Sequence, residues 1–249
     1  MSLRFDASGD SLTRTTNLPT ITAFTMMGWF YLVSDTNADE PFFEIGHATN
    51  INSTYMALFD GGGNNHFTLW NGNGGLDSVT LNMSTWYHIA MTVAGTGAGQ
   101  FKGYLNGALS ITHAGNAAPT SAKLWIANDT LATHLNGRAA AIKIYSAVLT
   151  VDEIAQEMWF YRPIRTANLN TWLPCVDPTT NNNATDISGN GYNMTVNGTL
   201  GFEDGPPIAW GPTRRNIYSA TSAPPPPGFS SEMFRRSRSF DRELCLLRR

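Results

Sequence analysis

Cysteine, charge and long apolar runs are all scarce in this 249-residue sequence. The two cysteines, Cys175 and Cys245, are far apart, so no disulfide framework is indicated and both thiols are expected to be unpaired. No apolar stretch approaches the roughly 20 residues that a membrane-spanning helix needs. The opening MSLRFDASGD has no basic segment followed by an apolar one. We therefore expect neither a cleaved secretion signal nor a membrane span.

Motifs for zinc and nucleotide chemistry are missing as well. No histidine has the His-x-x-x-His or paired-cysteine spacing of a zinc site; the five are His47, His66, His88, His113 and His134. The glycine-rich DGGGNNH segment lacks the lysine and the following helix of a phosphate-binding loop. These absences argue against a zinc enzyme and against a nucleotide-binding protein.

Glycine, asparagine, threonine, serine and aromatic residues are abundant, as in proteins made of short strands joined by polar turns. Residues 25–33 (TMMGWFYLV) are apolar at both parities, which predicts a strand covered on both faces. Residues 86–93 (WYHIAMTV) alternate, with Tyr87 on the core face. Asn106-Gly107 predicts a hairpin, because a type I′ turn needs positive φ at both central residues. The sequence therefore predicts an all-β antiparallel two-sheet sandwich.

One short helix is predicted, at about residues 150–161. Thr150 and Glu153 have the spacing of a capping box, and Pro163 stops the helix. Helical spacing also places Glu153 and Glu157 on one face. We favour the capping role of Glu153 over a paired-carboxylate site, because the capping box accounts for it.

The chain changes character after the helix. Residues 168–200 are rich in asparagine, with strands expected around 172–175 and 192–196. Residues 211–249 form an arm that contains a stiff polyproline spacer at 223–229 (APPPPGF). Beyond the spacer, the composition fits either an amphipathic helix or a disordered basic tail.

Charge is unevenly distributed between the arm and the rest of the chain. Residues 214–249 contain eight arginines and three acidic residues, a net charge of +5, whereas the remainder carries −8. Such a tail is drawn to an acidic partner surface, and the acidic body is not expected to bind nucleic acid. The residues expected to contact a partner are Met233, Phe234, Arg235, Arg236, Arg238, Phe240, Leu244 and Leu247.

Five segments between about Leu3 and Ile154 follow the order and spacing of one known family. They are LRFDASGDSLTRTTNL, FTMMGWFYL, WYHIAMTV, FKGYLNGALS and NGRAAAIKIYSAVLTVDEI. Together they resemble the laminin-G-like jelly roll, also called concanavalin-A-like lectin/glucanase. The later TWLP…DISGNGYNMTVNG resembles a phrase that the family places before its opening strand. The resemblance implies a jelly-roll domain at 1–210, with 168–200 completing the sandwich in permuted order. It is of the type found in tailed-phage structural proteins.

The jelly roll of this family hosts both glycosidases and lectins, so the residues must decide between them. A retaining glycosidase needs two carboxylates about 5–5.5 Å apart, which on a strand means evenly spaced acidic residues. Asp39, Glu40 and Glu44 come closest to such a run, but Pro41 interrupts the alternation and favours a loop. We therefore expect no hydrolase activity.

Calcium is the metal that the resemblance implies, held by loop carboxylates that include an adjacent acidic pair. At the matching positions this sequence has Ala140 and Ala141, which offer only backbone oxygens to an ion that takes about six to eight. Calcium is therefore disfavoured. Other aspartates remain as candidate ligands or as turn formers: Asp6 and Asp10 in the opening loop, then Asp60 and Asp129.

Aromatic and amide side chains are the candidates for glycan binding, because a ring can stack on a sugar and an amide can bond to its hydroxyls. These candidates are Trp70, Asn71, Asn73, Trp125, Asn128 and His134. The competing interpretation places both tryptophans in strand cores and the asparagines in turns.

Two hypotheses about function follow. The first is a non-enzymatic virion structural protein, a capsid decoration or tail-associated subunit, made in the host cytoplasm. It would form a homo-oligomer, bind other virion proteins or sister subunits through its arm, and display a sandwich able to bind cell-surface glycans. The second is an extracellular soluble or cell-surface lectin, either dependent on calcium or not.

Overall fold

The computed structural model describes residues 1–19, 23–34, 40–46, 54–59, 65–70, 74–95, 97–114, 123–128, 133–176 and 184–211. The predicted arm, apart from Gly211, lies outside these residues. The single helix among the described residues has seven residues, so no described helix is long enough to cross a membrane.

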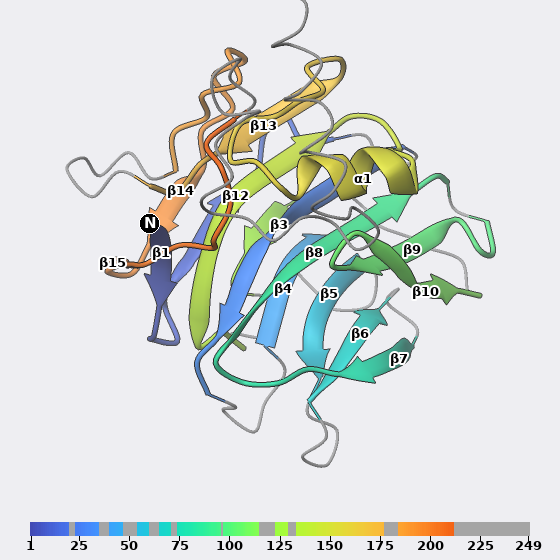
Figure 1. Ribbon diagram of the computed structural model, residues 1–249, viewed down its shortest axis with the longest axis horizontal. Helices are drawn as coiled ribbons and strands as arrows, with labels where there is room; N and C mark the ends of the chain where they lie inside the picture. The colour runs from blue at the N-terminus through green and yellow to red at the C-terminus, as the bar shows by residue number, and fades with distance from the viewer. Residues whose placement is uncertain are drawn as a thin grey trace, which may run out of the picture. The chain divides into compact units, whose positions relative to one another are not determined.

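Two antiparallel sheets make up the described domain, as the sequence predicted (Figure 1). Sheet A has eight strands, seven of them in the order β10-β9-β8-β3-β12-β1-β15, and β13 pairs with β12 beside β1. Its strands are β1 (Ser2–Phe5), β3 (Phe24–Leu32), β8 (Thr85–Val93), β9 (Phe101–Leu105), β10 (Ala108–His113), β12 (Gly137–Tyr145), β13 (Leu169–Leu173) and β15 (Gly201–Glu203).

Sheet B lies behind sheet A in Figure 1 and has seven strands in the order β14-β2-β11-β4-β5-β6-β7. Its strands are β2 (Ser11–Arg14), β4 (Glu40–Gly46), β5 (Thr54–Phe59), β6 (His66–Trp70), β7 (Gly75–Thr80), β11 (Lys123–Ile126) and β14 (Thr195–Asn197). Ser78 of β7 and Ser110 of β10 join the two sheets along one side, with 2.6 Å between their hydroxyl oxygens.

Local sequence patterns explain the central strands of sheet A. Both faces of β3 are buried, as its continuous apolar run predicted. In β8, Tyr87 belongs to the core between the sheets, which confirms the alternation. The hairpin between β9 and β10 turns at Asn106 and Gly107, whose φ values of 50° and 80° are those a type I′ turn requires.

The hydrophobic core fills the space between the two sheets. Because side chains alternate along a strand, a strand of the sandwich turns one of its faces to this core. Its largest fully buried members are Phe5, Phe24, Phe30, Phe42, Phe43, Phe67 and Phe101.

Helix α1 (Val151–Glu157) packs on the outer face of sheet A (Figure 1). Thr150 is its N-cap, and the capping box with Glu153 is present as predicted. The helix is shorter than the expected 150–161. Instead of continuing the helix, the next residues pair with a distant segment, since Tyr161 N–H donates to the carbonyl of Ala209 at 2.8 Å.

Residues 169–203 supply strands to both sheets, β13 and β15 to sheet A and β14 to sheet B. β13 and β14 occupy 169–173 and 195–197, each shifted by a few residues from the expected strands, and β15 was not predicted. The DISGNGYN phrase folds around Asp186, whose carboxylate accepts the backbone N–H groups of Trp172, Ser188 and Tyr192, all at 2.9 Å. This loop covers the free edge of β13.

Candidate functional site

Two tryptophans predicted to bind glycans share the outer face of sheet B. Leu69 and Ile126 belong to the core, so their neighbours Trp70 and Trp125 point to the opposite face by strand alternation. Both tryptophan side chains are partly exposed. Neither tryptophan is a member of the core cluster between the sheets.

Strand register places the two tryptophans in one row across sheet B. Trp125 lies opposite Glu44, Glu44 lies opposite position 55, and position 55 lies opposite Trp70. Adjacent strands are about 4.8 Å apart, so three strand spacings separate the tryptophan backbones by roughly 14 Å. On its other side, Trp125 lies opposite Thr13 of β2. We call the positions 13, 125, 44, 55 and 70 the sheet B row.

Neighbouring residues hold each indole in place. A Cβ at Gly75 would be 3.0 Å from Cε3 of Trp70, so the Trp70 ring lies directly against the glycine backbone on β7. The ammonium of Lys123 lies 3.5 Å from the ring centroid of Trp125, a cation–π contact. The Trp70 ring is thus held by close contact with the backbone of Gly75, and the Trp125 ring by the ammonium of Lys123.

Glu40 and Glu44, the carboxylates considered for a glycosidase, lie in strand β4 rather than in the expected loop, and both are buried. The loop interpretation was wrong because pairing with β5 and β11 accommodates Pro41 at a β-bulge, where the register shifts before Phe43. Phe43 and Phe42 both enter the core, so the bulge places Glu40 and Glu44 on opposite faces of the sheet. These two carboxylates do not converge on one substrate.

The remaining glycan candidates do not join the sheet B row. Asn128 and His134 form an isolated backbone bridge, and the Asn128 side chain is buried. Its amide donates to the carbonyls of Ser8 at 3.0 Å and Asp10 at 3.3 Å. Asn128 therefore stabilises the opening loop, a role that local sequence gave no sign of. Asn71 and Asn73 lie outside the described residues.

Asp10, a candidate calcium ligand, is occupied by backbone donors. One carboxylate oxygen accepts the N–H groups of Asp6 and Ala7, both at 3.0 Å, and the other accepts that of Thr199 at 3.1 Å. Asp10 thus ties the opening loop to the turn between β14 and β15. The side chain of Asp6 is 58% exposed, 3.7 Å from Arg4. Asp60 and Asp129 lie outside the described residues.

Ala140 and Ala141 lie in a buried apolar cluster on the outer face of sheet A. They pack with Trp29 and Tyr161, with Met158 alongside. Ala141 has φ of 53°, and the register of β12 against β3 shifts at this point. The two alanines therefore fill space beneath the chain that follows α1, and they offer no side-chain oxygen there. Within the described ranges, no three His, Cys, Asp or Glu side chains gather as a metal site would require. Neither the alanines nor Asp10 fit the calcium pattern.

A buried ion pair beneath α1 was not foreseen from the sequence. The Lys143 ammonium bonds to a carboxylate oxygen of Glu157 and to its carbonyl, both at 2.7 Å, and to the carbonyl of Phe160 at 2.8 Å. The second carboxylate oxygen of Glu157 accepts two backbone N–H groups, from Ile164 at 2.9 Å and Arg165 at 2.6 Å. The helical spacing of Glu157 was noted, but no local pattern connects it to a lysine on a strand.

Burial changes the protonation of groups near this pair. Burial, and secondarily the charge of Lys143, lowers the pKa of His88 to about 3, so His88 is neutral at physiological pH. Burial also lowers the pKa of Lys143 itself, and Glu157 opposes that effect. Burial raises the pKa of the Cys175 thiol to about 12, which makes it a poor nucleophile. All three side chains are buried, so they do not form an open reactive site.

Comparison with known sequences identifies one family. Residues 6–155 match the sequence model of the concanavalin A-like lectin/glucanases superfamily. The match covers more than half of the 249 residues and runs from the opening loop into α1. No curated protein sequence matches the chain.

Solved structures share this fold at low sequence identity. A proposed carbohydrate-binding protein from Bacteroides ovatus matches with a TM-score of 0.62 and 14% identity, over 84% of this chain and 61% of its own. A Trypanosoma rangeli sialidase in complex with the inhibitor DANA matches with a TM-score of 0.53 and 13% identity, over 62% of this chain and 26% of the sialidase. The chain spans less than two thirds of either protein, and at these identities the likeness concerns the fold alone.

Proposed function

The chain belongs to the concanavalin A-like lectin/glucanases superfamily, and from this premise we propose that it is a non-enzymatic carbohydrate-binding protein. The proposed binding surface is the outer face of sheet B around Trp70 and Trp125, the two partly exposed rings of the sheet B row. The observation that carries the proposal is that Trp70 and Trp125 share one face and one register. Aromatic rings fixed on rigid strands can stack on sugar rings without the ordering cost of a flexible loop.

The lack of hydrolysis is part of the proposal. The acidic residues nearest to a glycosidase arrangement, Glu40 and Glu44, lie on opposite faces of β4. Binding without calcium is also proposed, because the oxygens of Asp10 already accept three backbone N–H groups. A metal would have to displace these bonds.

A glycan array, run with and without EDTA, tests this proposal. We expect glycan hits that EDTA does not remove. Trp70→Ala and Trp125→Ala should each weaken binding about 2- to 12-fold, since an aromatic contact contributes about 0.5–1.5 kcal/mol. Gly75→Val should weaken binding by displacing the Trp70 ring. Trp210→Ala is the matched control, because Trp210 is half exposed but packs against Tyr161 on the sheet A side. If all four variants bind the glycan as tightly as the wild type does, the assignment to sheet B is refuted.

The biological setting that we propose is a virion, in which the protein is a capsid decoration or a tail-associated subunit. The charge contrast between residues 214–249, at +5, and the rest of the chain, at −8, supports attachment through the basic arm. Sister subunits or other virion proteins would be its partners, in a homo-oligomer. The alternative is an extracellular lectin, which needs only the sheet B row.

Co-purification separates these two settings. The full chain should sediment with a multimeric particle, and deletion of 214–249 should release it while the circular dichroism of the sandwich stays unchanged. A full-length protein that is always recovered free of particles, yet binds glycans, would support the extracellular lectin and reject the virion setting.

A further inference from the structure

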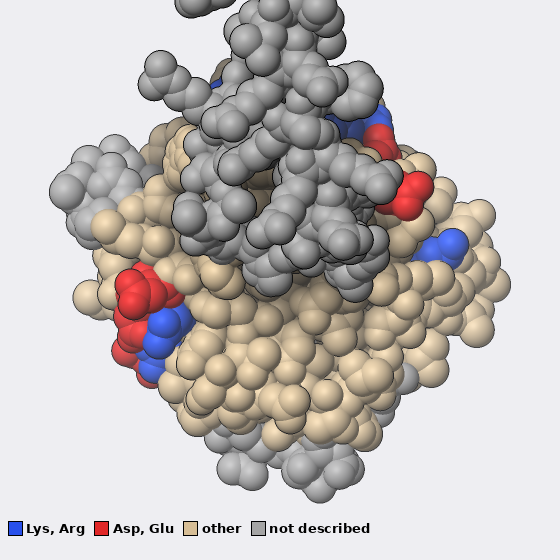
Figure 2. Space-filling view, in the orientation of Figure 1, with Lys and Arg blue, Asp and Glu red and all other residues tan. Residues whose placement is uncertain are grey.

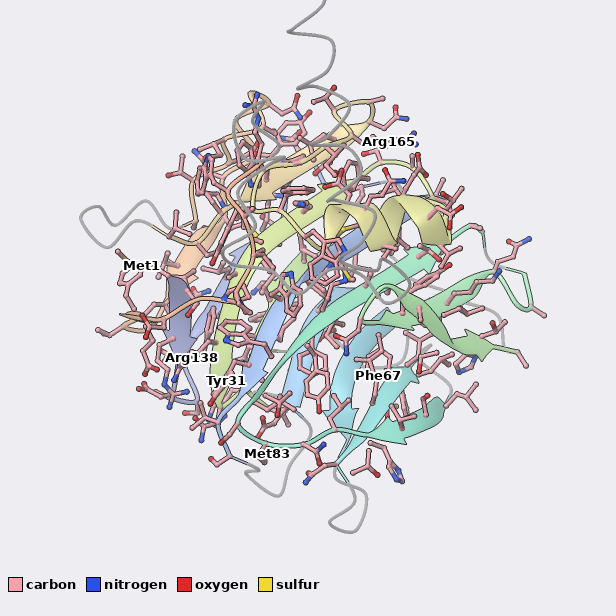
Figure 3. All side chains as sticks on the ribbon, in the orientation of Figure 1. Met1, Tyr31, Phe67, Met83, Arg138 and Arg165 are labelled. Carbon is pink, nitrogen blue, oxygen red and sulfur yellow. The ribbon has the colours of Figure 1, made fainter. Side chains whose placement is uncertain are left out.

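One row on the outer face of sheet A is partly exposed among the described residues, whereas the row next to it along β3 is covered. Met27 and Trp29 of β3 lie beneath α1 and the chain that follows it. Two residues further along β3, Tyr31 is partly exposed, as is Trp86 opposite it on β8. Figure 3 shows Tyr31 beside Arg138 at this end of the sheet.

This partly exposed row contains two arginines and two aromatic rings on four adjacent strands. Register pairs Arg4 with Arg138, Arg138 with Tyr31, and Tyr31 with Trp86. The two ring centroids are 5.4 Å apart, and the Arg138 guanidinium carbon lies 4.4 Å from the centroid of the Tyr31 ring. We call these four residues the sheet A row.

Placing two arginines directly opposite each other on neighbouring strands is unfavourable, because like charges repel at that distance. Two carboxylates offset the repulsion here, Asp6 at 3.7 Å from the Arg4 Nε and Glu203 between the two arginines. Glu203 lies 3.5 Å from the Arg4 Nε through one oxygen and pairs with Arg138 through the other. Arg138 also donates to the carbonyl of Asp204 at 3.3 Å. Figure 2 shows these opposite charges gathered at the edge near the N-terminus, while most of the described part of this face is uncharged.

Glu203 is accessible from solution although it pairs with both arginines. It lies on β15, a strand of three residues at the edge of sheet A, and its side chain is 39% exposed. Beside it is a shallow depression of about 460 Å³, lined by Met1, Arg138, Phe202, Glu203 and Asp204. A carboxylate from solution can reach Arg138 through this depression and compete with Glu203.

We propose that the sheet A row binds an acidic sugar, with its carboxylate on Arg138 and Arg4 in place of Glu203 and its ring against Tyr31 and Trp86. The chemistry of the row selects this ligand, because guanidinium groups bind carboxylates in two-point geometry and aromatic rings stack on sugar rings. A neutral sugar has no carboxylate to replace Glu203 as the partner of the arginines. A simple anion has no ring to stack on Tyr31 and Trp86. The site is independent of the sheet B row.

Titration calorimetry at low ionic strength tests the proposal with oligogalacturonate as the probe. Its methyl ester is the neutral control, and a heparin-derived oligosaccharide is the sulfated one. We expect binding of the acid, weaker binding of the ester, and no preference for the sulfated ligand. Arg138→Gln should weaken binding of the acid about tenfold, the usual effect of losing a charge-assisted hydrogen bond. Trp86→Ala should weaken it a few-fold.

Glu203→Gln provides a gain-of-binding test that unfolding cannot mimic. Removing the internal competitor should tighten binding of the acid a few-fold. Glu153→Gln is the matched control, since Glu153 pairs with Arg165 at a similarly exposed site elsewhere, and it should change nothing. The proposal is overturned if neither wild type nor Glu203→Gln binds the acid saturably, if the ester binds equally well, or if Arg138→Gln has no effect. Trp70→Ala should leave this binding intact, so failure here and failure at the sheet B row are distinguishable.

Discussion

Replacing Ala140 with aspartate reinstates one acidic residue of the family's calcium pair, and it discriminates between two explanations of the alanines. If they were neutral substitutions in an open loop, the aspartate would be tolerated and could help to bind calcium. The structure instead places Ala140 at 0% exposure on the outer face of sheet A, packed with Trp29 and Tyr161. We therefore expect Ala140→Asp to destabilise the fold.

The size of the effect follows from burial. Burial in this apolar cluster should raise the pKa of the introduced carboxyl by about three units from its ordinary 3.9, so that the group stays neutral at pH 7. This costs about 4 kcal/mol, at 1.36 kcal/mol per unit. Inserting extra atoms into a packed site adds about 1–3 kcal/mol. The sum is comparable with the total stability of an ordinary domain, roughly 5–15 kcal/mol.

Urea unfolding followed by circular dichroism measures the loss, with Ala94→Asp as the control at an exposed alanine. Because the folded state raises the pKa of the introduced carboxyl, the deficit relative to wild type should fall to the packing cost of about 1–3 kcal/mol below pH 4 and grow as the pH rises. Millimolar calcium should restore nothing. A loss below about 1 kcal/mol, or a recovery near the 2.7 kcal/mol that a ligand at 100 times its Kd supplies, would refute the reasoning.

Three further predictions concern the groups buried beneath α1 and in the core. Lys143→Met and Glu157→Gln should each cost about 3–5 kcal/mol in urea unfolding, and the double variant less than their sum, because each single change leaves a buried group without its partner. Since the pKa of His88 falls from 6.5 to about 3 on folding, the folded state binds fewer protons below pH 6.5 and loses about 2–3 kcal/mol between pH 6.5 and 4.5. His88→Gln should flatten that part of the stability–pH curve, and an unchanged slope would contradict the assignment. In a Cys245→Ser background, Cys175 should react with a thiol reagent at pH 8 only after unfolding, because burial raises its pKa to about 12; rapid labelling of the native protein would contradict this.

Patterns confined to one segment were readable from the sequence. The positive φ angles of Asn106 and Gly107 follow from their residue types, and the cap on α1 follows from the spacing of Thr150 and Glu153. Alternation along β8 placed Tyr87 correctly in the core. These features succeed because the physical causes, backbone sterics and hydrogen bonds three residues apart, act within a few residues of chain.

Features that depend on strand register came only from the tertiary structure. Trp70 and Trp125 are 55 positions apart in the sequence. Alternation within each strand says which face each ring takes only after the core face is known. The bulge that separates Glu40 from Glu44 arises from pairing with neighbouring strands, so no count along the segment could find it.

The sequence by itself determined the fold class and the family. It also determined that NGRAAAIKIYSAVLTVDEI contains a strand, a turn and a capped helix. Tertiary structure decided what its side chains do. Ala140 lies beneath residues far along the chain, and Lys143 meets Glu157 only because α1 folds back onto sheet A. The physical reason is that burial and pairing depend on which distant segments are in contact. Those contacts are set by packing of the whole sandwich.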